Sequence, residues 1–194
     1  LLLNRFFGPV INATRGIAGQ VDSAVSLFTT NFLTASRPQI VKYWASGNKN
    51  NFLLLLERIS KIGFFLLLIT VIPVFYEIDY LLKLWLKTPP EYTASFVRLI
   101  LITGVINFFN YPIVYAVQAT GRIALFEILG SGIRILILPV SWVFFAYGAP
   151  PQTAFVVSCI MTLLCAIVRF VIFCRQTDTS MIFYIRHVLA PMVG

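Results

Sequence analysis

Charged side chains are scarce in this sequence. Asp, Glu, Lys and Arg together make up 11% of the 194 residues, hydrophobic residues make up 59%, and the mean hydropathy is +0.88. A water-soluble domain is typically about 25% charged. So few charges cannot cover a water-facing surface, which indicates that lipid covers much of it. We therefore expect an all-α membrane protein, a bundle of several spanning helices.

Histidine and cysteine are also nearly absent. The only histidine is His187, and Cys159, Cys165 and Cys174 lie in one apolar stretch without the spacing of a zinc site. The chain shows no Ser/His/Asp set, no paired carboxylates and no glycine-rich phosphate loop after a strand. These absences predict no catalytic residues, no metal site and no cofactor, and hence a protein that is not an enzyme.

The charge that is present leans positive. Fifteen Lys and Arg residues stand against 7 Asp and Glu, which gives a net charge of +8. In a soluble domain this excess would suggest nucleic acid. In a membrane chain it is typical of cytoplasmic loops and of attraction to anionic headgroups. We therefore expect membrane lipids, and not nucleic acid, to meet these residues.

Five apolar stretches are long enough to cross a bilayer core as helices. A break at residues 4–9 precedes the first, and polar or Pro/Gly-rich segments at residues 47–51, 77–90, 121–122 and 148–152 separate the others. Pro38 is expected to end the first helix or begin a short new one, Pro73 to kink the second span and Pro112 to break the third, while Pro139 lies inside the fourth. The expected spans cover about residues 10–35, 57–76, 93–119, 123–146 and 153–174. Two amphipathic segments, about 38–46 and 78–90, are expected to lie in the membrane interface.

The distribution of Lys and Arg predicts the orientation of these spans. Basic residues gather in the connection after the first span, and others lie at the turn around Arg122 and in the loop around Arg175. The connections on the opposite side mix Lys83 and Lys87 with acidic residues. By the positive-inside rule, Lys49 and Arg122 should be cytoplasmic and Lys87 should lie outside.

Charged side chains within the spans are the first candidates for function, because each costs about 3 kcal/mol at mid-bilayer. Arg15 and Asp22 are seven residues apart and share a helix face. They form either a structural ion pair or a cavity-lining pair that binds an anion or couples to protons; alternatively, Arg15 snorkels to the outer interface. Glu127 and Arg134 have the same spacing, with small residues between them. Arg134 lies near mid-membrane and is the stronger candidate for lining a cavity.

A second group of candidates is uncharged. Asn107, Tyr111 and Gln118 form a polar stripe in the third span, with Asn110 beside it. This stripe predicts either hydrogen bonds between helices or contact with a sugar beside a hinge. Two further arginines, Arg98 and Arg169, are expected to snorkel to opposite interfaces.

Several blocks of the chain resemble a known family. Residues 3–18, LNRFFGPVINATRGIA, resemble the central N-x-F-F-G-P-x-x-N-A-x-R-G-I-A segment of bacterial O-antigen and capsular polysaccharide flippases. Residues 35–42 (ASRPQIVK), 84–86 (LWL), 90–92 (PEY) and 118–121 (QATG) are similar to further blocks in the same order. The resemblance spans nearly the whole chain, but Gly19 and Asp22 depart from it.

This resemblance implies the polysaccharide-transporter branch of the multidrug/oligosaccharidyl-lipid/polysaccharide exporter superfamily. Such proteins have two helical lobes around a central cavity and flip undecaprenyl-pyrophosphate-linked oligosaccharide across the bacterial inner membrane. It implies a MATE-like fold in which residues 1–194 form part of the C-terminal lobe. The N-terminal lobe of a longer chain and a coupling ion, H⁺ or Na⁺, would then be partners.

The sequence therefore predicts a lipid-linked oligosaccharide flippase that works by alternating access. The residues expected to act on the substrate or its coupling ion are Arg15 and Arg134 for the anion, Asn107 and Gln118 for the sugar, and Asp22 and Glu127 for coupling or structural ion pairs. A multidrug cation antiporter of the same superfamily stays open as an alternative, although it needs an acidic cavity. A membrane-embedded polysaccharide polymerase or acyltransferase also stays open, although His187 is the only histidine that could act in catalysis. A membrane scaffold that transports nothing is a third.

Overall fold

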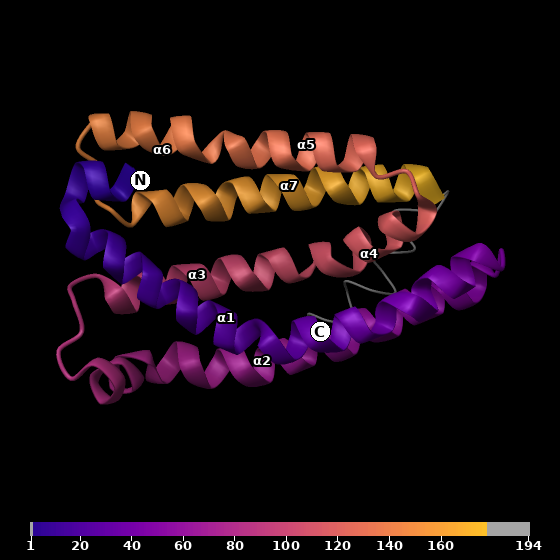
Figure 1. The fold of residues 1–194 in the computed structure, drawn as a ribbon, viewed down its shortest axis with the longest axis horizontal. Coiled ribbons are helices and arrows are strands. Elements are labelled where there is room, and N and C mark those ends of the chain that lie inside the picture. Colours follow the sequence, from indigo (N-terminus) through magenta and orange to yellow (C-terminus); the bar gives the residue numbers. More distant parts are fainter. Residues whose placement is uncertain (1, 178–194) are drawn as a thin grey trace.

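All the secondary structure in the described part of the chain is helical. A computed structural model describes residues 2–177, which contain seven α-helices and no β-strand (Figure 1). The helices are α1 (Leu2–Ala45), α2 (Lys49–Leu86), α3 (Thr93–Phe108), α4 (Asn110–Thr120), α5 (Ala124–Ile135), α6 (Ile137–Ala146) and α7 (Thr153–Thr177). The predicted all-α class is confirmed.

Four helical stretches within residues 2–177 are long and apolar enough to cross a membrane. They are α2, α3 with α4, α5 with α6, and α7. The protein is therefore a multi-pass helical membrane bundle. The longest helix, α1, is not among these four, because polar residues such as Arg15, Gln20 and Asp22 interrupt its apolar run. The span predicted at about residues 10–35 stays a prediction.

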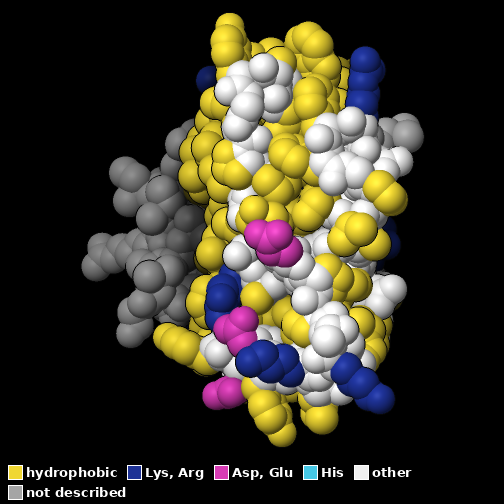
Figure 2. All heavy atoms as spheres, turned by 90° about the vertical axis from the view of Figure 1, so that its left-hand side faces the viewer, with side chains coloured by type: hydrophobic (Ala, Val, Ile, Leu, Met, Phe, Trp, Pro, Cys, Tyr) yellow, Lys and Arg dark blue, Asp and Glu magenta, His cyan; other side chains and the backbone are white. Residues whose placement is uncertain are grey.

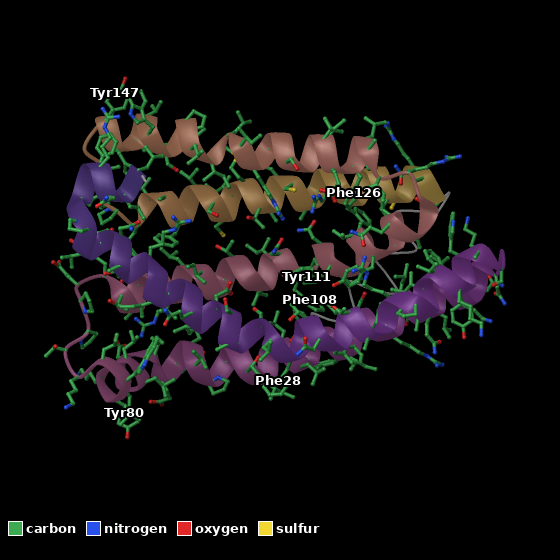
Figure 3. The ribbon with its side chains drawn as sticks, viewed as in Figure 1. Phe28, Tyr80, Phe108, Tyr111, Phe126 and Tyr147 are labelled. Carbon is green, nitrogen blue, oxygen red and sulfur yellow. The ribbon has the colours of Figure 1, made fainter. Side chains whose placement is uncertain are left out.

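Large apolar side chains cover the outside of the bundle. Phe28, Tyr80 and Tyr147 point outward from the helices in Figure 3 and are 67%, 64% and 88% exposed. Phe108 and Phe126 are each 1% exposed and lie among the helices. A surface of this kind is suited to lipid rather than to water.

Prolines set the breaks inside the paired helices. The break between α3 and α4 lies at Phe109, and that between α5 and α6 lies at Leu136. Each is three residues before a proline, Pro112 or Pro139, whose ring clashes with the carbonyl of the fourth residue before it. The break predicted near Pro112 is confirmed, and Pro139 interrupts the fourth span in the same way.

Two other prolines leave their helices continuous. α1 runs through Pro38 to Ala45, and α2 runs through Pro73 to Leu86. The predicted end of the first helix at Pro38 is therefore wrong, and segments 38–46 and 78–90 consist largely of the last turns of α1 and α2. A proline costs one backbone hydrogen bond, and the close packing of α1 on α2 offsets this loss. The break predicted at residues 4–9 is present as a kink at Gly8, whose φ of 84° suits glycine.

The helices form successive layers. Figure 1 shows α5 and α6 on the outer side of α7, and α3 and α4 between α7 and the α1–α2 pair. α7 packs against α3, α4, α5 and α6, while α1 packs against α2, α3 and α4. The helices α3 and α7 are therefore central, and polar groups on their facing sides are shielded from lipid.

The helix ends fall into two groups. The α1–α2 and α4–α5 connections and the end of α7 lie at one end of the bundle; the N-terminus and the α2–α3 and α6–α7 connections lie at the other (Figure 1). Gln176 donates to the carbonyl of Arg122 at the first end, over 3.1 Å. Figure 2 looks onto the second end, where acidic and basic side chains mix among hydrophobic ones. The alternation matches the grouping of connections that the charges predicted.

Cysteine labelling tests which end is cytoplasmic. In a background without the three native cysteines, Lys49→Cys and Arg122→Cys should react with a membrane-impermeant maleimide only after intact cells are permeabilised. Lys87→Cys should react in intact cells, because it lies at the opposite end. Labelling of position 49 but not of position 87 in intact cells would reverse the orientation.

Candidate functional site

A partly open pocket of about 250 Å³ with polar side chains in its wall lies where α1, α3, α5, α6 and α7 meet. Two charged side chains line it, Asp22 of α1 and Arg134 of α5, together with the amide of Asn107 on α3. Hydroxyl groups complete its polar lining, from Thr103, Ser158 and Thr162. The rest of the wall is apolar or glycine, so the charges act in surroundings less polar than water.

A glycine on α3 gives the Asp22 carboxylate its place. The Oδ1 atom of Asp22 lies 3.0 Å from the position that a Cβ atom on Gly104 would take. A side chain at position 104 would have to displace this oxygen. Gly104 therefore lets the carboxylate lie directly against the α3 backbone.

Arg134 lies in the last turn of α5, where the negative end of the helix dipole favours a cation. Its Nη2 donates to Oδ1 of Asn107 over 3.2 Å. This hydrogen bond uses one of the five N–H donors of a guanidinium. Arg134 can therefore hold Asn107 and a ligand at the same time.

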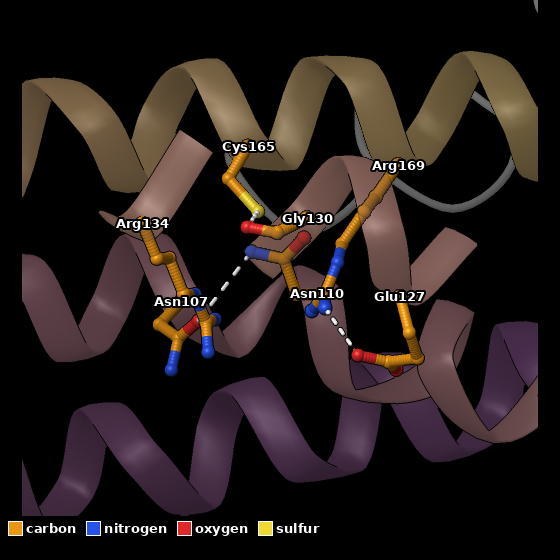
Figure 4. A network of polar contacts seen from close by, with 7 residues as sticks. All are labelled: Asn107, Asn110, Glu127, Gly130, Arg134, Cys165 and Arg169. Carbon is orange, nitrogen blue, oxygen red and sulfur yellow. Dashed lines mark hydrogen bonds and ion pairs between the residues drawn. The ribbon is translucent and has the colours of Figure 1, made fainter. Parts of the chain in front are cut away.

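Asn107 has a second neighbour in Asn110, the first residue of α4. Nδ2 of Asn110 donates to Oδ1 of Asn107 over 3.5 Å (Figure 4). The same oxygen thus accepts from Arg134 and from Asn110. This arrangement fixes which end of the Asn107 amide faces the arginine.

An ion pair lies beside these residues, between α5 and α7, and its arginine is buried whereas the Glu127 side chain is 43% exposed. Arg169 is 5% exposed, and its Nη2 donates to Oε2 of Glu127 over 3.1 Å. The guanidinium carbon lies 4.7 Å from the ring centroid of Phe126. A Cβ atom on Gly130 would lie 2.5 Å from Nε of Arg169, so any side chain there would displace the guanidinium. The prediction that Arg169 snorkels to the interface is wrong, because Glu127 supplies a counter-charge within the bundle.

The structure brings together three of the six site residues that the sequence predicts. Asp22, Asn107 and Arg134 all line the pocket. Glu127 does not line the pocket; it forms an ion pair with Arg169, and a structural ion pair is one of the two roles expected of it. Arg15 is exposed on α1, and within residues 2–177 it forms no ion pair with Asp22.

Gln118 lies outside the pocket, on α4. Its Oε1 accepts a hydrogen bond of 2.6 Å from Nη2 of Arg37. The same guanidinium lies 4.8 Å from the ring centroid of Tyr115, whose hydroxyl is 3.3 Å from that of Thr34. These contacts join α4 to α1. The polar stripe of the third span therefore includes hydrogen bonds between helices, one of its two predicted roles.

Three pocket hydroxyls were not singled out from the sequence. Thr103 donates to the carbonyl of Leu99, one turn earlier, over 2.8 Å. Hydroxyls in apolar helices commonly bond in this way, so neither Thr103 nor Ser158 nor Thr162 stands out by pattern. The pairing of Arg169 with Glu127 also has no local signal, because it joins residues 42 positions apart.

Comparison with known proteins adds no assignment. No family model, curated protein or solved structure matches the chain. The chemistry of the pocket must therefore be argued from its side chains. A guanidinium and an amide offer N–H donors to an oxygen-rich anion, the hydroxyls suit a sugar, and the carboxylate suits a proton or a cation.

Proposed function

We propose that the protein is a flippase that carries a lipid-linked oligosaccharide across a bacterial inner membrane. The observation that supports this most directly is the meeting of Asp22, Asn107 and Arg134 in one pocket within an apolar helical bundle. Charged groups among membrane-spanning helices are costly, and in membrane proteins they usually serve a substrate or an ion. The resemblance of residues 3–18 to polysaccharide flippases points to the same substrate class.

Arg134 supplies the contact with the head of the substrate. Its planar guanidinium can bind a pyrophosphate through two parallel hydrogen bonds, which are stronger in a site with little water. A pocket of about 250 Å³ suits a group of this size better than a whole oligosaccharide. The amide of Asn107 and the pocket hydroxyls can then hydrogen-bond the first sugar.

The lipid tail has a separate surface on the same helix. An apolar groove of about 360 Å³ lies between α1 and α2, lined by Val21, Val25, Ile78 and Trp85 among others. Asp22, the neighbour of Val21, lines the polar pocket instead. α1 therefore lies between a polar site for the head and an apolar surface for the tail.

Asp22 favours a second candidate, a multidrug cation antiporter of the same superfamily. A carboxylate in a helical pocket attracts organic cations and can exchange them for protons. Arg134 lines the same pocket and repels cations. The two candidates therefore differ in which of the two charges their substrate requires.

Reconstitution distinguishes the candidates. The complete protein in liposomes should move a fluorescent lipid-pyrophosphate oligosaccharide from the inner to the outer leaflet, measured as access of an external glycosidase. Inorganic pyrophosphate should inhibit this movement, because it competes for Arg134. A protein that leaves this lipid in place and exchanges tetraphenylphosphonium for protons would be an antiporter.

A further inference from the structure

Two asparagines connect the pocket with the buried arginine of the Glu127–Arg169 pair. Asn107 lines the pocket, and Asn110, on α4, is 1% exposed. In Figure 4 the Asn110 amide lies between Asn107 and Arg169, with its nitrogen bonded toward Asn107. Its Oδ1 is buried and has no hydrogen-bond partner among the described residues.

Arg169 offers a buried donor that matches this unpaired acceptor. Its Nε–H is buried and unbonded in the described part of the chain, although Nη2 is held by Glu127. The ring of Phe126 and the backbone at Gly130 fix the guanidinium on two further sides. Because α7 packs against both α4 and α5, this fixed cation lies at the junction that also holds Asn110. A buried acceptor and a buried donor thus lie at one junction, where each is costly alone.

A fixed cation selects one orientation of a neighbouring amide. An amide has an acceptor end and a donor end, so turning it over exchanges the two. The charge of Arg169 favours the orientation that directs Oδ1 of Asn110 toward it, which leaves Nδ2 to donate to Asn107. Asn107 then presents its oxygen to Asn110 and Arg134. Its Nδ2, which also bonds the Tyr111 hydroxyl, has one N–H left for the pocket.

We propose that Arg169 is a positioning residue for the pocket. Its guanidinium orients the Asn110 amide, Asn110 orients Asn107, and Asn107 holds Arg134 toward the ligand. This positioning role rests on the proposed function. It specifies what the pocket recognises, namely the acceptor oxygens of an anion. Both Arg134 and Asn107 then face the ligand with N–H donors, so a ligand that offers only donors is disfavoured.

Asn110→Asp separates positioning from support of the fold. The variant keeps an acceptor for Arg169 and adds a charge that pairs with it, but it loses the Nδ2 donor to Asn107. Thermal stability of the complete protein should therefore be kept, while its affinity for inorganic pyrophosphate, measured by calorimetry, falls about tenfold. Unchanged affinity in the stable variant would overturn the proposal.

Two neighbouring glycines give a matched pair of variants. Gly130→Ala forces the guanidinium of Arg169 to move and should weaken pyrophosphate binding about tenfold. Gly132→Ala, where nothing lies within 4 Å of the added Cβ, should bind as the wild type does. Equal affinity of the two alanine variants would count against this relay, which runs from Arg169 through Asn110 and Asn107 to Arg134.

A double-mutant cycle keeps the two proposals distinguishable. In an Arg134→Ala background, Asn110→Asp should weaken pyrophosphate binding no further, since both residues act through one contact. Independent losses would contradict the relay.

If the wild type itself binds no pyrophosphate, the proposed function fails, and the relay is then decided on melting temperatures without ligand. Asn110→Leu and Arg134→Ala should lower these less together than the sum of their separate effects, and additive shifts would refute the relay.

Discussion

Arg134→Ala should lower transport by the complete protein by at least about 100-fold at unchanged protein level. Hydrogen bonds to charged groups contribute about 1.5–3 kcal/mol each, and a guanidinium that grips a pyrophosphate through two of them loses both. Arg134→Lys should keep part of the activity, because lysine retains the charge but not the planar fork. The measurement is surface polysaccharide in a flippase-null strain, normalised to protein in the membrane.

Arg15→Ala is the matched control for this prediction. Arg15 and Arg134 are both exposed, but Arg15 lies on α1, outside the residues that line the pocket. Its transport should stay close to that of the wild type. Equal activity of the wild type and Arg134→Ala would end the assignment of Arg134 to the substrate. Loss of Arg134→Ala from the membrane would instead indicate a structural role.

The fold was largely predictable because lipid restricts the choices of a chain. Backbone groups in a bilayer must bond within their own helix, so an apolar sequence with so few charges has to form helices. The turns at Gly47 and Gly121 were visible for a related reason. Both have positive φ angles, 69° and 75°, which glycine adopts at the least cost.

The effect of each proline was harder to predict. Pro112 and Pro139 break their helices, whereas Pro38 and Pro73 do not. Each of the four prolines removes one backbone hydrogen bond, so the sequence alone does not distinguish the prolines that break a helix from those that leave it continuous. What differs is how long a helix runs on either side and what it packs against, and this is a property of the assembled bundle.

The sequence predicted only those site residues whose place within an apolar helix is enough to mark them. Arg134 and Asn107 could be found because a polar group in the middle of an apolar helix needs a polar neighbour. Which charged residues pair with one another could not be found from spacing within a helix. Glu127 pairs across to Arg169 on α7 rather than along its own helix to Arg134. Such pairings depend on which helices pack together and at what height.

Glu127→Leu should destabilise the protein by about 3 kcal/mol, because it leaves the charge of Arg169 buried without a partner. The side chain of Arg169 is 6% exposed, so it cannot turn to water when the carboxylate is removed. The loss is expected as a fall in melting temperature of the purified protein in detergent. Replacing both partners, Glu127→Leu with Arg169→Met, should recover much of it, since no buried charge then remains.

Asp79→Leu tests whether burial, rather than the presence of an ion pair, sets this cost. Asp79 and Arg98 form the shorter pair, at 2.6 Å against 3.1 Å, but their side chains are 60% and 36% exposed. Water can solvate Arg98 when Asp79 is replaced, so the expected destabilisation is about 0–1 kcal/mol. The longer pair, whose arginine is buried, should therefore matter more than the shorter pair, in which both side chains reach water. Equal falls in melting temperature for Glu127→Leu and Asp79→Leu would show that Arg169 reaches water after its partner is removed.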